Sequence, residues 1–256
     1  MLRFMANRLL MLIPILLGVV TITFFLMYVI PGDPVLSLAG ERYDEETLEG
    51  MRRELGLDRP LAVQYVNYLG RLARFDLGRS FVTGRPVSEG IAERFPRTLL
   101  LASSAMLLAV AGGVFAGMLS MWKRYDRLGK PLMALSLAGV SIPVFWLGLM
   151  LIYLFSIRLR LLPPSGFGGG SIRYLVLPAV TLSFASMATI ARVTRAGFLE
   201  AGSGDFVRTA RAKGLAESSV MAKHVLRNAL IPVVTIVGTD FGSYLSGSVL
   251  TETIFG

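Results

Sequence analysis

The chain contains no cysteine and a single histidine, His224, among its 256 residues. The absence of cysteine excludes a disulfide framework, a thiolate nucleophile and a cysteine metal site. A single histidine excludes a paired-histidine metal site and leaves a Ser–His hydrolase without suitable partner residues. We therefore expect no catalytic residues and no metal site, and we expect His224 to lie on a surface or interface.

A phosphate-binding loop is also missing. The only Gly-Lys pair, Gly129-Lys130, is followed by proline, whereas a P-loop requires Ser or Thr after the lysine. The glycine run at 168–170 has no such Lys-Ser or Lys-Thr after it. We expect the chain to bind no cofactor and to be no enzyme by itself, so that any transport energy comes from a partner protein or an ion gradient.

Charged residues are scarce, at 17% of the chain against 54% hydrophobic residues, and the mean hydropathy is +0.62. This composition is too apolar for an ordinary soluble domain and places the chain in a membrane. The net charge of +9 would suggest nucleic acid in a soluble protein. Here the basic residues interleave with the ends of apolar runs, so we expect membrane lipid as a partner and no nucleic acid.

Five apolar runs are long enough to cross a bilayer as helices. They cover residues 9–32, 98–122, 131–157, 174–191 and 230–251. The first run is too long for a signal peptide and no cleavage site follows it. Pro143 predicts a kink in the third run, because proline removes an intrahelical hydrogen bond. The sequence therefore predicts an all-α integral membrane protein built as a polytopic helical bundle.

The positive-inside rule orients these spans. The N-terminus, the loop at 123–130 and the insert at 192–228 together carry a net charge equal to the chain's whole excess of +9. We therefore predict a multi-pass plasma-membrane protein with a cytoplasmic N-terminus. The predicted organisation is an N-terminal transmembrane helix at 1–32, an extracytoplasmic cap at 33–97 and a transmembrane core at 98–256.

The basic insert before the fifth run has a helix–glycine–helix pattern. Residues 205–213 predict a short helix with Asp205 as its capping acceptor. Its expected apolar residues are Val207, Ala210 and Ala212. Gly214 ends this helix, and the second helix resumes at Glu217. The second helix carries an apolar stripe formed by Val220, Met221, Val225, Leu226 and Ala229. Charge alone would indicate only a cytoplasmic loop, whereas this ordered pattern favours a docking element.

The segments FVRTARAKGL at 206–215 and HVLRNALIP at 224–232 resemble the EAA loop of ABC-importer permeases. The form is that of the dipeptide/oligopeptide permease family. The motifs PGDP, LGLDRPL, DLGRS and ETIFG, elsewhere in the chain, also resemble that family, so the resemblance extends over nearly the whole chain. Arg208 stands where the general EAA signature has Glu, and the peptide-permease branch is basic at this position.

The resemblance implies a type I ABC-importer permease fold with six helices. Five of these six are found, and we expect the chain to be cut short before the sixth. It also implies a bacterial inner-membrane protein that imports di- or oligopeptides, with nickel chelates, glutathione or sugars less favoured. The implied partners are a homologous second permease, two cytoplasmic ATPase subunits that carry ATP and Mg²⁺, and an extracytoplasmic substrate-binding protein. The cap would either meet that binding protein or only cover the transmembrane ends.

In the family, the EAA loop couples the permease to the ATPase, which implies this role for residues 197–228. The implied coupling residues are Asp205, Arg208, Thr209, Ala210, Arg211, Lys213, Gly214, Leu215, His224 and Arg227.

Asp240 is the one charged residue within the predicted spans. Since an ionised carboxylate at the bilayer centre costs at least about 2.5–3.5 kcal/mol, it should face a water-filled path or a partner helix. One interpretation places Asp240 and Ser243 on the translocation path. Another gives Asp240 a structural contact to Ser243, Thr239 or the partner permease. An alternative function, an ion-gradient-driven secondary transporter using Asp240, is disfavoured because no internal repeat is found.

Two glycine pairs have the small-xxx-small spacing that lets membrane helices approach closely. They are Gly113 with Gly117, and Gly238 with Gly242. We expect helix packing at both pairs.

Overall fold

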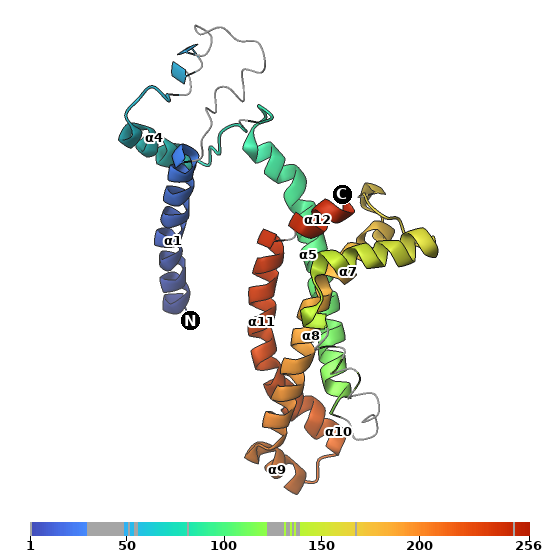
Figure 1. Ribbon diagram of the computed structural model, residues 1–256. Coiled ribbons are helices and arrows are strands. Elements are labelled where there is room, and N and C mark those ends of the chain that lie inside the picture. The colour runs from blue at the N-terminus through green and yellow to red at the C-terminus, as the bar shows by residue number, and fades with distance from the viewer. Residues whose placement is uncertain are drawn as a thin grey trace. The chain divides into compact units, whose positions relative to one another are not determined.

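The computed structural model describes residues 2–29, 49–50, 52–53, 56–80, 82–121, 139–166, 168–247 and 249–256, and positions 131, 134 and 136. Nearly all of these residues are helical, and the only β-pairing among them is an isolated bridge between Arg79 and Pro86. The predicted all-α class is therefore confirmed. The chain divides into two compact units, Met1–Arg94 and Phe95–Gly256 (Figure 1). The predictions for 31–34 and for the loop at 123–130 lie outside the described residues.

In the first unit, helix α1 (Leu2–Val29) packs against helix α4 (Leu61–Ala73) through aromatic side chains. The Phe24 ring lies 5.2 Å from that of Tyr65 and 5.6 Å from that of Tyr68, measured between centroids. The Tyr65 hydroxyl also shares a 2.6 Å hydrogen bond with the Thr21 hydroxyl. Most other α1 side chains are exposed, so these aromatic contacts are what join the two helices.

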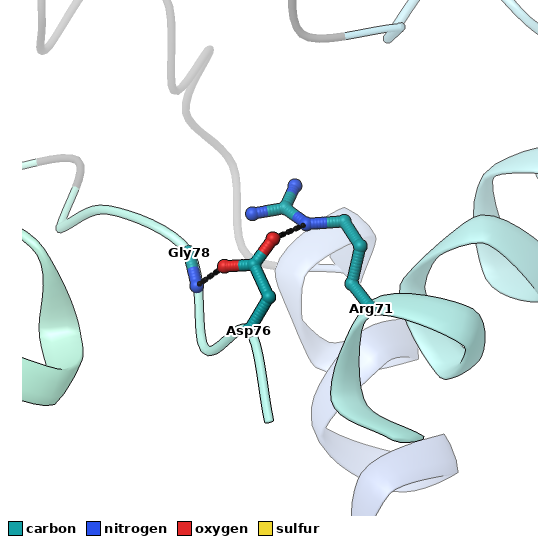
Figure 2. A network of polar contacts seen from close by, with 3 residues as sticks. All are labelled: Arg71, Asp76 and Gly78. Atoms are coloured by element: carbon teal, nitrogen blue, oxygen red, sulfur yellow. Dashed lines mark hydrogen bonds and ion pairs between the residues drawn. The ribbon is translucent and has the colours of Figure 1, made fainter. Parts of the chain in front are cut away.

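The DLGRS motif forms the turn that follows α4 (Figure 2). Asp76 accepts one hydrogen bond from Arg71 Nε and another from the Gly78 backbone N–H, both at 2.9 Å. These two bonds, led by the one from Arg71, lower the pKa of Asp76. Gly78 has a φ of 75°, and a Cβ at this position would lie 2.7 Å from Arg71 Nη2. The motif therefore encodes a specific turn.

The second unit contains the remaining helices, and α5 (Val87–Leu119) crosses the boundary into it. Those that follow are α7 (Val144–Leu151), η2 (Ile152–Arg158), η3 (Gly168–Gly170), α8 (Ile172–Gly202), α9 (Asp205–Ala212), α10 (Glu217–Ser219), η4 (Val220–Val225), α11 (Leu226–Gly247) and α12 (Val249–Phe255). Within this unit, α9 and α10 lie at one end of the α8 and α11 pair, and α12 lies at the other end (Figure 1).

Four helical stretches of the described chain are long and apolar enough to span a membrane. They are 3–27, 87–119, 172–202 and 217–246. The third predicted run differs from expectation, because the chain breaks rather than kinks at Pro143, whose ψ of 132° is extended. The described residues before the break, at 139–141, are helical, and the helical stretch after it covers 144–158.

The fifth predicted run is described as two helices, α11 (Leu226–Gly247) and α12 (Val249–Phe255), and Ser248 lies outside the described residues. The ETIFG motif forms the separate helix α12, which packs on α7 and α8. Phe255 lies against Gly148 of α7, and Glu252 accepts a 2.8 Å hydrogen bond from the Thr98 hydroxyl of α5. These polar and aromatic contacts anchor α12 to α5 and α7.

Helix α8 is the centre of the second unit. Its most apolar window is 56% buried, against 33% for α5 and 22% for the stretch that includes α11. The core cluster joins α5, α8 and α11, with Ala102, Ala105, Ala179, Ile190 and Val233 among its most buried members. Side chains of α8 therefore contact both neighbouring helices.

Small residues set the distance between these helices. A Cβ added to Gly113 would lie 2.7 Å from Ile190 Cγ2, and one added to Gly117 would lie 2.6 Å from Thr194 Cβ. A Cβ added to Gly197 of α8 would lie 2.8 Å from the Ala229 carbonyl oxygen of α11. A Cβ on Gly238 or Gly242 would meet nothing within 4 Å, so the packing expected there is not found within the described chain.

Candidate functional site

The basic insert folds as a small helical unit against the end of α8. Val207 and Ala210 of α9 are buried, and Val220, Val225 and Ala229 of the following helix are buried with them. Met221 and Leu226 are half-buried beside this cluster. Ala212, expected on the apolar face, is exposed. The insert therefore has its own hydrophobic core, which fixes its outer surface.

Gly214 forms the turn between the two helices of the insert. Its φ of 75° is in the left-handed region, which glycine adopts without the strain imposed by a Cβ. Its N–H donates to the Arg211 carbonyl at 2.9 Å, as is typical of a helix that ends at a glycine. The direction of the second helix therefore depends on this residue.

Arg211 and Glu217 bridge this glycine turn with two hydrogen bonds. Arg211 Nε donates to Glu217 Oε2 at 3.0 Å, and Nη2 donates to Oε1 at 2.6 Å. The pair lowers the pKa of Glu217 and raises the pKa of Arg211, in both cases chiefly through these hydrogen bonds. The sequence interpretation missed Glu217, although its place just after the glycine turn was a usable signal.

Asp205 does not cap α9 as predicted. The N-cap is Gly204, and no side-chain capping hydrogen bond is formed. The Asp205 carboxylate instead lies 3.6 Å from Arg208 Nη1 on the exposed surface. As the first helical residue, Asp205 still places a negative charge near the positive end of the helix dipole.

Most of the expected coupling residues are exposed. The exposed members are Asp205, Arg208, Thr209, Arg211, Lys213, Gly214, Leu215 and Arg227. His224 is half-buried, and Ala210 belongs to the core rather than to the surface. Phe206 and Leu215 are 41% and 42% exposed, so the surface combines basic and large apolar groups.

Asp240 of α11 is held by a residue of α8. The Ser186 hydroxyl donates to Asp240 Oδ2 at 2.6 Å. Of the contacts considered from sequence, those to Thr239 and Ser243 are not formed, because both hydroxyls donate to backbone carbonyls of their own helix. Ser186 lies 54 residues earlier in the chain, so only the fold brings it to Asp240.

A second interhelical hydrogen bond extends this contact. The Tyr244 hydroxyl donates to the Leu182 carbonyl at 3.0 Å, one turn further along both helices. The same antiparallel register relates Gly197 to Ala229 near the basic insert. Ser186 is therefore placed opposite Asp240 by the packing of whole helices rather than by a local turn.

The energetic requirement of Asp240 is only partly met within the chain. An ionised carboxylate at this depth costs about 2.5–3.5 kcal/mol or more, and a hydrogen bond to a charged group returns about 1.5–3 kcal/mol. No Lys, Arg or His of the described residues forms an ion pair with Asp240. Asp240 is half-buried in the described chain.

Long apolar helices around a buried α8, with a structured basic insert at one end, define a helical membrane protein. Comparison with known families identifies which one. The chain belongs to the family of binding-protein-dependent transport system inner membrane components, whose model matches residues 109–256. The N-terminal model of the same membrane components matches residues 1–102. The predicted family is thereby confirmed.

Curated relatives agree over the full length of this chain. It is 45% identical over 283 residues to the di/tripeptide transport system permease protein DppB of Pseudomonas aeruginosa, covering 100% of this chain and 84% of the relative. It is 43% identical over 258 residues to the glutathione transport system permease protein GsiC of Escherichia coli, covering 100% and 83%. Both relatives are transport permeases, in agreement with the family.

A solved structure titled "Crystal structure of an amino acid ABC transporter with histidines" shares the fold. Its TM-score is 0.50 at 19% sequence identity, and the match covers 66% of this chain and 75% of that chain. The predicted ABC-permease fold is therefore confirmed. Among the described residues, no group of three or more acidic or histidine side chains could hold a metal ion.

Proposed function

We propose that this chain forms half of the translocation path of an ATP-driven importer for di- or oligopeptides. The named substrates of its relatives, di/tripeptides and glutathione, support this substrate class. In this proposal the chain pairs with a homologous permease, and two cytoplasmic ATPase subunits and a substrate-binding protein complete the transporter. The N-terminus and the insert at 197–228 lie in the cytoplasm. The family and relatives favour this function over the secondary transporter.

The observation that carries the coupling role is the insert's two-sided construction. Its inner face is a hydrophobic core continuous with α8 and α11, through Phe198, Ala201 and Ala229. Its outer face presents Phe206 and Leu215 among basic side chains. A rigid element attached to two long helices can transmit a push from a docked ATPase into the membrane, because packed helices move as units.

The experiment is purification of the tagged chain with its partners, followed by assays of ATP hydrolysis and of labelled tripeptide uptake. Arg208→Glu should reduce ATPase recovery and uptake while the protein stays in the membrane, because it reverses a charge on the exposed face. Gly214→Pro should uncouple hydrolysis from uptake, because proline cannot adopt a φ of 75°. Val82→Glu, at an 88% exposed site of the first unit, is the matched control for the added charge.

Two outcomes would contradict this function. Normal substrate-stimulated hydrolysis and uptake in both insert variants would exclude the coupling role. A chain that binds no ATPase and supports uptake that an uncoupler abolishes would instead establish the secondary transporter.

A further inference from the structure

We propose that Asp240 recognises the ammonium group of the transported solute, with Ser186 as the residue that positions the carboxylate. This inference rests on the proposed function, since it names the chemical group that the path accepts. It assigns substrate recognition to the membrane-spanning chain itself, at a contact between α8 and α11.

Ser186 holds the Asp240 carboxylate in one orientation and leaves one of its two oxygens without a hydrogen bond from the described residues. Ser186 is buried, and its hydroxyl occupies Asp240 Oδ2. Within the described residues, Oδ1 receives no hydrogen bond and no cation neutralises the group. Asp240 is only half-buried in this unit. A fixed carboxylate with one uncommitted oxygen is suited to a ligand that brings its own positive charge.

The neighbouring hydroxyls make this surface rich in hydrogen-bond acceptors. Thr239 and Ser243 are exposed beside Asp240, and both donate their protons to carbonyls of α11 at 3.0–3.2 Å. The hydroxyl oxygens of Thr239 and Ser243 can still accept hydrogen bonds, but their protons are already donated to carbonyls of α11. An ammonium group has three donors and no acceptor, whereas a carboxylate needs donors. The surface therefore favours cationic ammonium groups and disfavours anionic ones.

The two flanks of α11 differ in a way that places a polar path next to Asp240. Thr239, Ser243 and Ser246 are exposed on one flank. Ile231 and Val234, on another flank, are 65% and 70% exposed and carry no hydrogen-bonding side-chain group. Asp240 lies next to the hydroxyl flank, so a solute that moves along it would pass the carboxylate.

The absence of native cysteine permits a direct test. Ser243→Cys places the chain's only thiol one helical turn from Asp240. The assembled transporter in proteoliposomes is treated with an ammonium-bearing or a sulfonate-bearing methanethiosulfonate, and the ratio of the two labelling rates is measured. A transporter without the introduced cysteine gives the background from the other subunits. Adding Asp240→Asn should lower the preference for the cationic reagent by about tenfold or more, as expected for charges a few ångströms apart.

Matched variants separate recognition from structure. Asp240→Glu should retain the cation preference, and Ser186→Ala should weaken it while Ser186→Thr, which keeps the hydroxyl, restores it. Val234→Cys is the control position, and its labelling ratio should not depend on residue 240. Ser246→Cys provides a second reporter on the hydroxyl flank if Ser243→Cys does not fold.

The outcomes distinguish this inference from the proposed function. With binding protein and ATP present, trialanine should slow cationic labelling of the Asp240 chain. A charge preference that depends on Asp240 but is insensitive to trialanine would support cation recognition and contradict peptide transport. A ratio unchanged by Asp240→Asn would overturn the inference, because the carboxylate would then be neutralised by the partner permease or by a proton.

Discussion

Helices α5 and α11 carry the same glycine spacing but use it differently. Gly113 and Gly117 of α5 lie against Ile190 and Thr194 of α8, at distances that leave no room for a Cβ. Gly238 and Gly242 of α11 have open space around them in this chain. The glycine spacing therefore indicates that another helix can pack closely at this site, but it does not identify that helix. Among the described residues, nothing packs against the open pair of α11.

The largest expected effect on stability comes from a large side chain at the packed glycine pair of α5. Gly113→Leu should destabilise the folded chain by about 1–3 kcal/mol, because the new atoms would meet Ile190 and the Met187 backbone carbonyl, which cannot rotate away. The thermal unfolding midpoint of the purified chain in detergent measures this effect.

Gly238→Leu is the matched control for this substitution, with the same residue types and the same spacing motif. We expect its unfolding midpoint to equal that of the wild type when the chain is purified alone. Recovery of the second permease should fall instead if the open face is its contact. Equal destabilisation by the two variants would show that α11 has a partner within this chain.

The two interhelical hydrogen bonds of α11 allow a second comparison, between a charged and a neutral acceptor. Ser186→Ala should destabilise the chain by about 1–2 kcal/mol, since it removes the donor to a half-buried carboxylate. Tyr244→Phe should cost less, about 0.5–1.5 kcal/mol, because the Leu182 carbonyl can keep its intrahelical partner. The same unfolding assay measures both.

Asp240→Asn tests whether charge is the reason for this difference. In the Asp240→Asn background, Ser186→Ala should lower the free energy of unfolding by no more than Tyr244→Phe does. The reason is that an amide has a smaller desolvation cost in the bilayer than a carboxylate. An unchanged cost of Ser186→Ala would mean that the charge of residue 240 does not determine the strength of this contact, because the asparagine carbonyl can still accept the Ser186 hydrogen bond.

The sequence predicted the features that repeat locally and missed those that depend on tertiary contacts. The stripe from Val220 to Ala229 follows helical periodicity, and Val220, Val225 and Ala229 are buried, while Met221 and Leu226 are half-buried. Ser186 could not be found this way, because its relation to Asp240 depends on the register of two helices far apart in the chain. The contacts of Glu252 with α5 and of Phe255 with α7 were missed for the same reason.

Gly214 differs from both glycine pairs because its role is conformational. Nothing lies within 4 Å of where its Cβ would be, yet its φ is 75°. Gly214→Ala should therefore cost about 1 kcal/mol through backbone strain alone. Protection of the insert from limited proteolysis should fall, while the unfolding midpoint of the whole chain changes little. Gly202→Ala, in open space at an ordinary helical φ, should leave protection unchanged.

The smallest expected effect concerns the exposed Arg211–Glu217 pair across the same turn. Because its lowered pKa favours the carboxylate in the folded chain, the contribution of Glu217 is fully present above the ordinary pKa of glutamate. That contribution is lost as the pH falls through the lowered folded-state pKa. Glu217→Gln should therefore reduce protection of the insert at pH 7, and the difference from wild type should shrink as the pH falls through this acidic range.

Solvent screening limits the size of this effect, since both side chains are at least half exposed. High salt should consequently reduce the difference between Glu217→Gln and wild type, whereas the strain in Gly214→Ala should be insensitive to salt. A Glu217→Gln effect that persists unchanged at acidic pH and in high salt would show that Glu217 orients the second helix through its shape rather than its charge. The ion pair would then have no part in holding the turn that Gly214 makes possible.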